Sequence, residues 1–212
     1  PLVSSSAASD VYKRQVNDGA TTAQEGQILA GFTADVEFDV ADDVGDLKAV
    51  MGSNDPAGHL TEANSITVDN DGLGDRVVNA NDGAILASFT ADVEFDVADD
   101  VGALKSVMGT NDPASYLTEA NSITVNDAVT GSKVTASDGA ILAGFTADVE
   151  FDVVDNAGAL IAEMGGGNPA GHLTEANSIT VDDAVTGSNV NASDGGILAG
   201  FTADVEFDVV DT

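Results

Sequence analysis

The residues best suited to chemistry lie in the string DNDGLGD, residues 69–75. Carboxylates at alternate positions, next to a glycine that allows a sharp turn, suit a hard cation such as Ca²⁺. We therefore predict Asp69, Asp71 and Asp75 as metal ligands, with Ca²⁺ as the ion. The loop is not an EF-hand, because Ala80 stands where that motif has a glutamate. The alternative is a turn rich in Asp, Asn and Gly between two strands, since the equivalent segments 126–132 and 182–188 lack the full pattern.

A second set of carboxylates occurs in four copies of the string FTADVEFDV. In each copy a glutamate and an aspartate stand two residues apart, so both would lie on one face of a strand. Such rows could gather Ca²⁺, or a cationic or glycan ligand, and the alternative is a strand face that is simply solvated. The eight residues are Glu37, Asp39, Glu94, Asp96, Glu150, Asp152, Glu206 and Asp208.

Paired acids could also indicate glycoside hydrolysis. Catalysis would need one site that departs from the repeat, with an acid whose pKa differs from that of its partner. Here the acids recur identically, and the sequence contains no serine triad, P-loop or dinucleotide fingerprint. His59 and His172 share one repeat position with Tyr116, which favours a packing role over a catalytic one. We predict that the chain is not an enzyme.

The composition excludes several classes of protein. Asp and Glu number 37 against 6 Lys and Arg, the formal net charge is −31, and Cys is absent. A basic nucleic-acid-binding protein, a disulfide scaffold and a Cys-ligated zinc site are therefore excluded. Short apolar runs predict no membrane insertion. The expected partners are cations and, in a second hypothesis, a cell-surface or matrix ligand, although the same charge also fits a protein adapted to high salt.

The elements that must position these residues repeat along the chain. FTADVEFDV begins at Phe32, Phe89, Phe145 and Phe201, at spacings of 57, 56 and 56 residues, and TEANSITV recurs with the same period. A fixed period indicates units that bury their apolar faces against their neighbours. We predict repeats at 32–88, 89–144 and 145–200, with 16–31 as the end of one truncated repeat and 201–212 as the start of another.

Each repeat divides into two halves of about 28 residues, and each half reads as a strand followed by a helix. ADVEFDV and ANSITV alternate apolar and polar residues, which is typical of strands with one buried face. Val101 and Leu104 recur at helical spacing, and Gly109 stands where a C-cap glycine would fall. Ser137 or Asp138 is predicted to cap the second helix.

These patterns predict an α/β fold, namely a repeat solenoid with a parallel sheet, because every crossover passes through a helix. The alternatives are an all-β solenoid and an array of sandwich domains, although sandwiches usually need about 100 residues per domain. Identical strands side by side would place like charges about 4.8 Å apart, at a cost of roughly 0.9 kcal/mol per pair in water. The charges therefore favour a sheet in which ADVEFDV and ANSITV strands alternate.

Residues 5–15, SSAASDVYKRQ, resemble the translation of a transposase sequencing adapter. We therefore expect residues 1–15 to be a disordered artefact. An export signal would then be missing from the sequence.

Residues 16–212, with FDVVDNAGALIAEM at 151–164 and ANSITV, resemble long bacterial surface proteins with SDTAANL-type strand–helix repeats, similar to RTX-type adhesins. The loop at 69–75 resembles the calcium loops of thrombospondin type 3 repeats. The resemblance implies a secreted or cell-surface location. Our first hypothesis is a non-enzymatic structural or adhesive segment of a larger protein, stiffened by Ca²⁺. The second is a module that binds a cation or glycan on its acidic sheet face.

Overall fold

The computed structural model describes residues 14–15, 19–30, 36–51, 60, 63–87, 92–107, 117, 120–145, 147–164, 173, 175–184, 187–201 and 203–210. The chain forms two compact units. Unit 1 comprises Pro1–Val78 and Ile85–Phe95, and unit 2 comprises Asn79–Ala84 and Asp96–Thr212. The predicted packing positions His59, Tyr116 and His172, and the predicted C-cap Gly109, lie outside the described residues.

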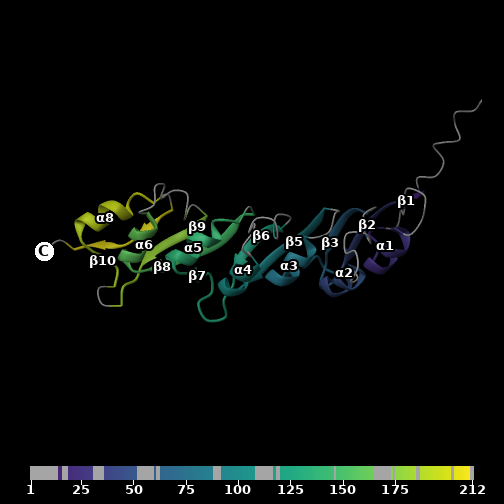
Figure 1. Ribbon diagram of the computed structural model, residues 1–212, viewed down its shortest axis with the longest axis horizontal. Helices are drawn as coiled ribbons and strands as arrows, with labels where there is room; N and C mark the ends of the chain where they lie inside the picture. Colours follow the sequence, from purple (N-terminus) through teal and green to yellow (C-terminus); the bar gives the residue numbers. More distant parts are fainter. Residues whose placement is uncertain are drawn as a thin grey trace, which may run out of the picture. The chain divides into compact units, whose positions relative to one another are not determined.

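Strands and helices alternate along the chain (Figure 1). The strands are β1 (Arg14–Gln15), β2 (Val36–Asp42), β3 (Ala63–Val68), β4 (Val77–Val78), β5 (Val93–Asp99), β6 (Ala120–Val125), β7 (Lys133–Val134), β8 (Val149–Asp155), β9 (Ala176–Val181), β10 (Asn189–Val190), β11 (Val205–Glu206) and β12 (Asp208–Val209). The described helices are α1 (Ala23–Ala30), α2 (Val44–Met51), α3 (Ala80–Leu86), α4 (Val101–Val107), α5 (Ala136–Leu142), α6 (Ala157–Met164) and α8 (Ala192–Leu198). None of them is long and apolar enough to span a bilayer.

The main strands pair in parallel, which confirms the α/β class and is incompatible with the all-β alternatives. In unit 1 the strand order is β1, β2, β3 and the first part of β5. In unit 2 it is the second part of β5, then β6, β8, β9 and β11. Strands of the ADVEFDV and ANSITV types therefore alternate, as the charge pattern predicts.

Neighbouring repeats are staggered along the strands. In unit 2, Val154 lies opposite Thr180, and Thr180 lies opposite Glu206. Glu206 is therefore level with Val154 and not with Glu150, its own equivalent four residues earlier. Four residues correspond to about 13 Å along the strand and two strand spacings to about 9.6 Å across it, so equivalent residues are about 16 Å apart. In unit 1 Ala41, Thr67 and Glu94 share one row in the same way.

The stagger explains the two-residue strands β7 and β10, which the sequence patterns do not predict. Of the residues of β8, only Val149 and Glu150 at its start pair with β6. β7 then pairs with the continuation of β8, at Asp152 and Val153. The short strand thus satisfies ladder positions that the staggered neighbour cannot reach. In the same way β10 pairs with β12.

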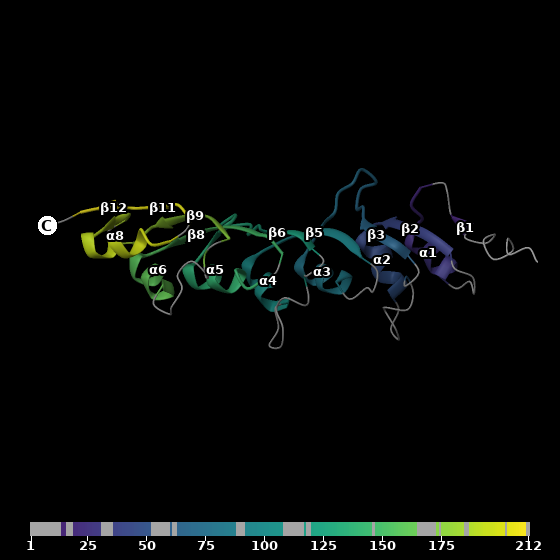
Figure 2. The same cartoon turned by 90° about the horizontal axis from the view of Figure 1, so that it is seen from above.

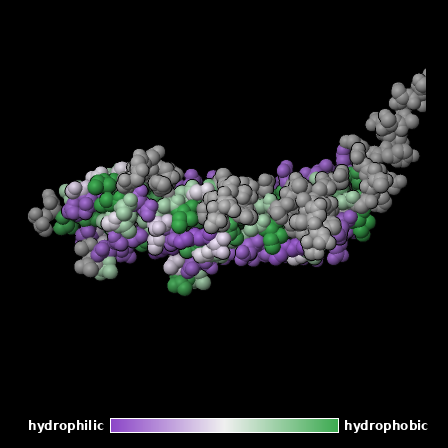
Figure 3. Space-filling model, viewed as in Figure 1, coloured by the Kyte–Doolittle hydropathy of each residue, from purple (hydrophilic) through white to green (hydrophobic). Residues whose placement is uncertain are grey.

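The core lies between the strands and the helices. Val149, Phe151 and Val153 of β8 are buried, as are Leu142 of α5 and Leu160 of α6. Within each unit the helices lie on one side of the strands (Figure 2). Hydrophilic residues cover much of the described surface in the view of Figure 3, with separate hydrophobic spots between them. The polar residues that alternate with the buried ones in the strands, such as Glu150 and Asp152 of β8, face the opposite side of the sheet.

Two local expectations are wrong. The cap of α5 is Thr135, whose side chain accepts a hydrogen bond from the Asp138 N–H, and not Ser137 or Asp138. The helix begins earlier because Thr135 and Asp138 bind each other: Oγ1 of Thr135 accepts the N–H of Asp138 and donates to its Oδ2 at 2.9 Å. Of the expected disordered artefact at residues 1–15, Arg14 and Gln15 form β1 and pair with β2, and the rest lies outside the described residues.

Candidate functional site

The aspartates of the outer sheet face are held by serine hydroxyls. In β8 the buried residues alternate with the exposed Glu150 and the half-buried Asp152. Ser178 donates to Oδ1 of Asp152 at 2.7 Å, and Ser132 donates to Oδ2 at 2.6 Å. Glu150 and Asp152 therefore lie on one face of β8, and both oxygens of Asp152 already accept hydrogen bonds. The equivalent donors are Ser65 for Asp39, Ser122 for Asp96 and Ser188 for Asp208.

The glutamates of the same face stand opposite other groups. Glu37 lies opposite Gln15. Three further glutamates lie opposite a threonine of the ANSITV strand. In unit 1 one of them, Glu94, binds a cation of the chain itself, because Nη1 of Arg76 lies 3.0 Å from its Oε2. The threonine pairs are Thr67 with Glu94, Thr124 with Glu150 and Thr180 with Glu206.

A third set of carboxylates ends the long strands. Asp155 accepts a hydrogen bond from the N–H of Asn156 at 2.8 Å and another from the N–H of Ala136 at 3.1 Å. Ala136 is the first residue of α5, which belongs to the preceding repeat, 19 residues earlier. The carboxylate therefore satisfies a free helix N–H and connects two successive repeats. The equivalent pairs are Asp42 with Ala23 and Asp99 with Ala80, also 19 residues apart.

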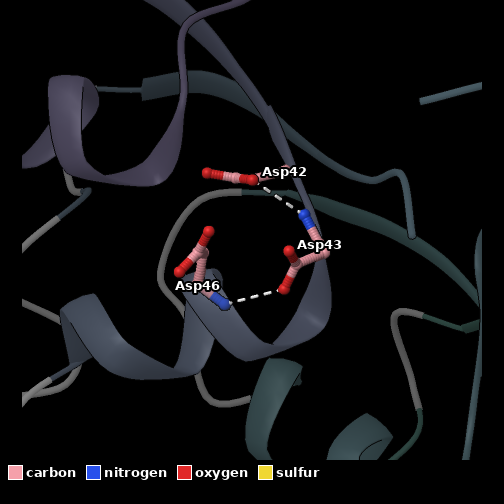
Figure 4. Close-up of side chains that lie close together, drawn as sticks. All are labelled: Asp42, Asp43 and Asp46. Atoms are coloured by element: carbon pink, nitrogen blue, oxygen red, sulfur yellow. Dashed lines mark hydrogen bonds between the residues drawn. The ribbon is translucent and has the colours of Figure 1, made fainter. Parts of the chain in front are cut away.

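In the first repeat two further carboxylates, those of Asp43 and Asp46, lie close to the strand-end carboxylate of Asp42. Asp43 caps α2 by accepting a hydrogen bond from the N–H of Asp46 at 2.9 Å. Oxygen atoms of Asp42, Asp43 and Asp46 lie within 4.8 Å of one another (Figure 4). Among the described residues this is the only group of three carboxylates so close together. The charge of Asp43, followed by that of Asp42 and by desolvation, raises the pKa of Asp46 above its ordinary value.

Replacing Asp46 by asparagine is expected to raise the melting temperature at low ionic strength. The folded state raises the pKa of Asp46, so the repulsion is present above that pKa and is relieved as the pH falls through it. Thermal melts at neutral pH, in low salt and in molar NaCl, should show a gain that salt screening removes. Asp148→Asn, at an exposed residue before β8, gives the same charge change without the cluster. A lower melting temperature for Asp46→Asn at low salt would contradict the prediction.

The predicted calcium loop has the hydrogen bonds of an Asx-rich turn. Oδ1 of Asp71 accepts from the N–H of Leu73 at 2.8 Å and from that of Asp75 at 3.1 Å. Oδ1 of Asp69 accepts from the N–H of Gly74 at 2.8 Å. The backbone N–H groups of Leu73 and then of Asp75 lower the pKa of Asp71. In the next repeat Oδ1 of Asp127 accepts from the N–H groups of Val129 and Thr130, although that loop lacks the calcium pattern.

Likeness to other proteins assigns no role to these carboxylates. The chain matches no protein-family model, no curated protein and no solved structure. Their roles are therefore inferred from their own hydrogen bonds and charges.

The structure brings together some of the predicted site residues and not others. Among the described residues, Asp69, Asp71 and Asp75 do not form a group of three within 4.8 Å. The closest cluster, Asp42 with Asp43 and Asp46, is absent from the sequence-based predictions. Its signal is acids at positions i, i+1 and i+4 across the junction of a strand and a helix, where the first helical turn brings the last acid back to the first two.

Calcium binding by the loop stays a prediction, and Asp71→Asn provides its check. The amide oxygen can still accept the N–H groups of Leu73 and Asp75, so the turn is kept while the charge is lost. Calcium bound by the loop would raise the melting temperature in CaCl₂ beyond that in NaCl of equal ionic strength. We expect the variant to lose most of that gain. A gain that survives in the variant would place the ion elsewhere, and no gain in the wild type would contradict calcium binding.

Proposed function

We propose that this chain is a non-enzymatic structural segment of a larger secreted or cell-surface protein, built as an α/β repeat solenoid that holds other parts of that protein apart. The observation that carries the proposal is the repeated strand-end aspartate. Asp42, Asp99 and Asp155 each cap a helix of the preceding repeat with the same separation of 19 residues. Identical links between successive repeats are what a stacked array requires.

The distribution of the acids supports a structural role over a catalytic one. Asp155 and its equivalents cap helices, and Asp152 and its equivalents accept serine hydroxyls on the sheet face. The acidic positions that depart from the repeat pattern, such as Asp46 and the loop at 69–75, have no histidine beside them in the sequence. The surface location rests on the resemblance to bacterial surface repeats.

The experiment that tests the solenoid is a measurement of length against repeat number. Residues 145–200 are inserted once more, and then three more times, into the 212-residue chain, and each protein is measured by small-angle X-ray scattering. We expect the maximum dimension to grow by about 16 Å per added repeat, at a constant cross-section, because that is the displacement between equivalent residues. Growth of about 25 Å or more per repeat would indicate separate domains. That result, or a widening cross-section, would overturn the proposal.

A further inference from the structure

The strand at residues 205–210 of unit 2 has the same sequence as β8 but only one paired edge. Residues 149–155 and 205–211 both read VEFDVVD. β8 pairs with β6 and β7 on one side and with β9 on the other. The strand at 205–210 pairs with β9 and β10 on one side, and among the described residues no strand pairs with its other side. One strand sequence is therefore seen with and without its second neighbour.

The open edge leaves apolar side chains of this strand partly exposed. Val153 of β8 is fully buried, whereas its equivalent Val209 is 53% exposed. Phe151 is also fully buried, whereas its equivalent Phe207 is half-buried. Because the two sequences are identical, the difference comes from what covers each strand. In β8 the cover includes β9, whose Ile179 lies opposite Val153.

Hydrogen bonds to the strand aspartates also indicate what this edge binds. In three repeats Oδ1 of the aspartate accepts a serine hydroxyl from the ANSITV-type strand 26 residues later. In the fourth copy Asp208 accepts Ser188 through Oδ2, and no serine of the described residues donates to its Oδ1. The edge thus offers an apolar surface and an acceptor that both match an ANSITV-type strand. The three serine–aspartate pairs are Ser65 with Asp39, Ser122 with Asp96 and Ser178 with Asp152.

The open edge is formed without its second neighbour. The N–H of Asp208 donates to the carbonyl of Ser188, and the N–H of Val210 donates to the carbonyl of Val190. Successive residues of a strand direct their N–H groups to opposite sides, so the N–H of Val209 points to the open edge. Since β10 already holds the strand, a partner would bind with little cost of ordering it.

The geometry points to the open edge of residues 205–210 as a docking site for a half-repeat of a partner chain, which adds an ANSITV-type strand in parallel and packs a leucine against α8. Strand addition to an open sheet edge is a general mode of peptide recognition. Within unit 2, Leu173 packs in this way against Gly139 of α5, and Gly195 is the same position of α8.

The partner is a chain that offers an unpaired ANSITV-type strand. A second copy of this chain does not fit, because β3, β6 and β9 each have a neighbouring strand on both sides. The inference rests on the proposed repeat array, since it extends the strand order of that array to another chain.

In the test, the full 212-residue chain is titrated into a fluorescein-labelled peptide with the sequence of residues 156–181, and binding is followed by fluorescence anisotropy. We expect saturable binding with a dissociation constant below about 100 μM. Leu173→Ala or Ile179→Asn in the peptide should each weaken binding at least about tenfold, because both side chains fill apolar positions. Ser178→Ala, which removes only the hydroxyl for Asp208, should weaken it about threefold. Binding that none of these changes weakens would overturn the proposal.

A variant of the chain tests the edge itself. Val209→Pro removes the N–H that points to the open edge and keeps the N–H groups that bind β10, so it should weaken binding at least about tenfold. Val209→Thr keeps that N–H and is the control, with an expected effect of about threefold or less. Melts by circular dichroism establish that both variants fold. Full binding by the proline variant would overturn the edge as the docking site.

Disulfide formation tests the register, since the chain contains no Cys of its own. Val154 lies opposite Thr180, so Val210→Cys in the chain should face Thr180→Cys in the peptide. This pair should cross-link at least about fivefold faster than Val210→Cys with Ser178→Cys, because a shift of two residues places the Cα atoms about 8 Å apart. Equal rates would overturn the parallel register.

The docking site and the proposed solenoid can fail separately. If the peptide does not bind, but the length still grows by about 16 Å per inserted repeat, the docking site is overturned and the solenoid stands.

Discussion

Replacing Gly139 by alanine is expected to lower the free energy of unfolding by about 1–2 kcal/mol, as measured by urea denaturation. An added Cβ would lie 2.9 Å from Cδ2 of Leu173, 3.0 Å from Cε2 of Phe151 and 3.1 Å from Cγ2 of Val153. These neighbours are buried and come from different segments, so they cannot all move aside. Overpacking of this kind costs about 1–3 kcal/mol, which the better helix propensity of alanine offsets by at most about 1 kcal/mol.

The matched control for this change is Gly196→Ala in α8. Gly196 stands at the helix position that Ala140 takes in α5, and an added Cβ there has no heavy atom within 4 Å. This variant should therefore gain about 0.5–1 kcal/mol from helix propensity. The two substitutions are chemically identical but opposite in expected sign. A gain for both would show that α5 does not pack against β8 as closely as described.

Asp155→Ala is expected to destabilise the chain by about 2–3 kcal/mol, because a carboxylate that accepts two backbone N–H groups is removed. The amide of Ala136 loses its acceptor and α5 loses part of its cap. Hydrogen exchange should therefore show faster exchange of the Ala136 amide, one repeat away from the substitution. Urea denaturation gives the loss of stability itself.

Asp152→Ala is the control for Asp155→Ala, because it also removes an aspartate from β8 but leaves the hydrogen bond to Ala136 in place. Asp152 lies three residues earlier in the same strand and accepts only serine hydroxyls on the outer face. Its loss should cost about 1 kcal/mol or less, because both serines can turn to water. Equal costs for the two variants would contradict the role of Asp155 as a link between repeats.

Much of the fold could be predicted from the sequence because its signals are local. The alternation of Val149, Phe151 and Val153 with Glu150 and Asp152 defines a one-sided strand wherever it occurs. The parallel pairing follows from the helices that separate consecutive strands. The order of the strands follows from the cost of placing identical acidic strands side by side.

The remaining features depend on register, which no local pattern contains. The sequence does not show that Glu206 is level with Val154, so it predicts neither the stagger nor β7. The link from Asp155 to Ala136 joins a side chain to a backbone N–H, and every residue except proline offers such a donor. The strand-end acids could therefore be placed near a helix N-terminus, but their second partner could not be identified.

For the predicted calcium loop, the sequence and the structure indicate different roles for Asp71. The spacing of Asp69, Asp71 and Asp75 indicates ligands, whereas the structure directs an oxygen of Asp71 toward the backbone of its own turn. Asp127 also closes a turn in the next repeat, by accepting the N–H groups of Val129 and Thr130, without the pattern. An aspartate that closes a turn and one that binds an ion have the same spacing, because both need a sharp bend with inward-facing oxygens.

The four-residue stagger also has a mechanical consequence. Within each unit, equivalent residues are displaced by about 13 Å along the strands and only about 9.6 Å across them. Tension applied along that displacement acts mainly parallel to the strands, so it shears many ladder hydrogen bonds together and does not peel them one at a time. A segment built in this way should resist stretching until a whole repeat gives way, and each rupture should release on the order of 180 Å of chain.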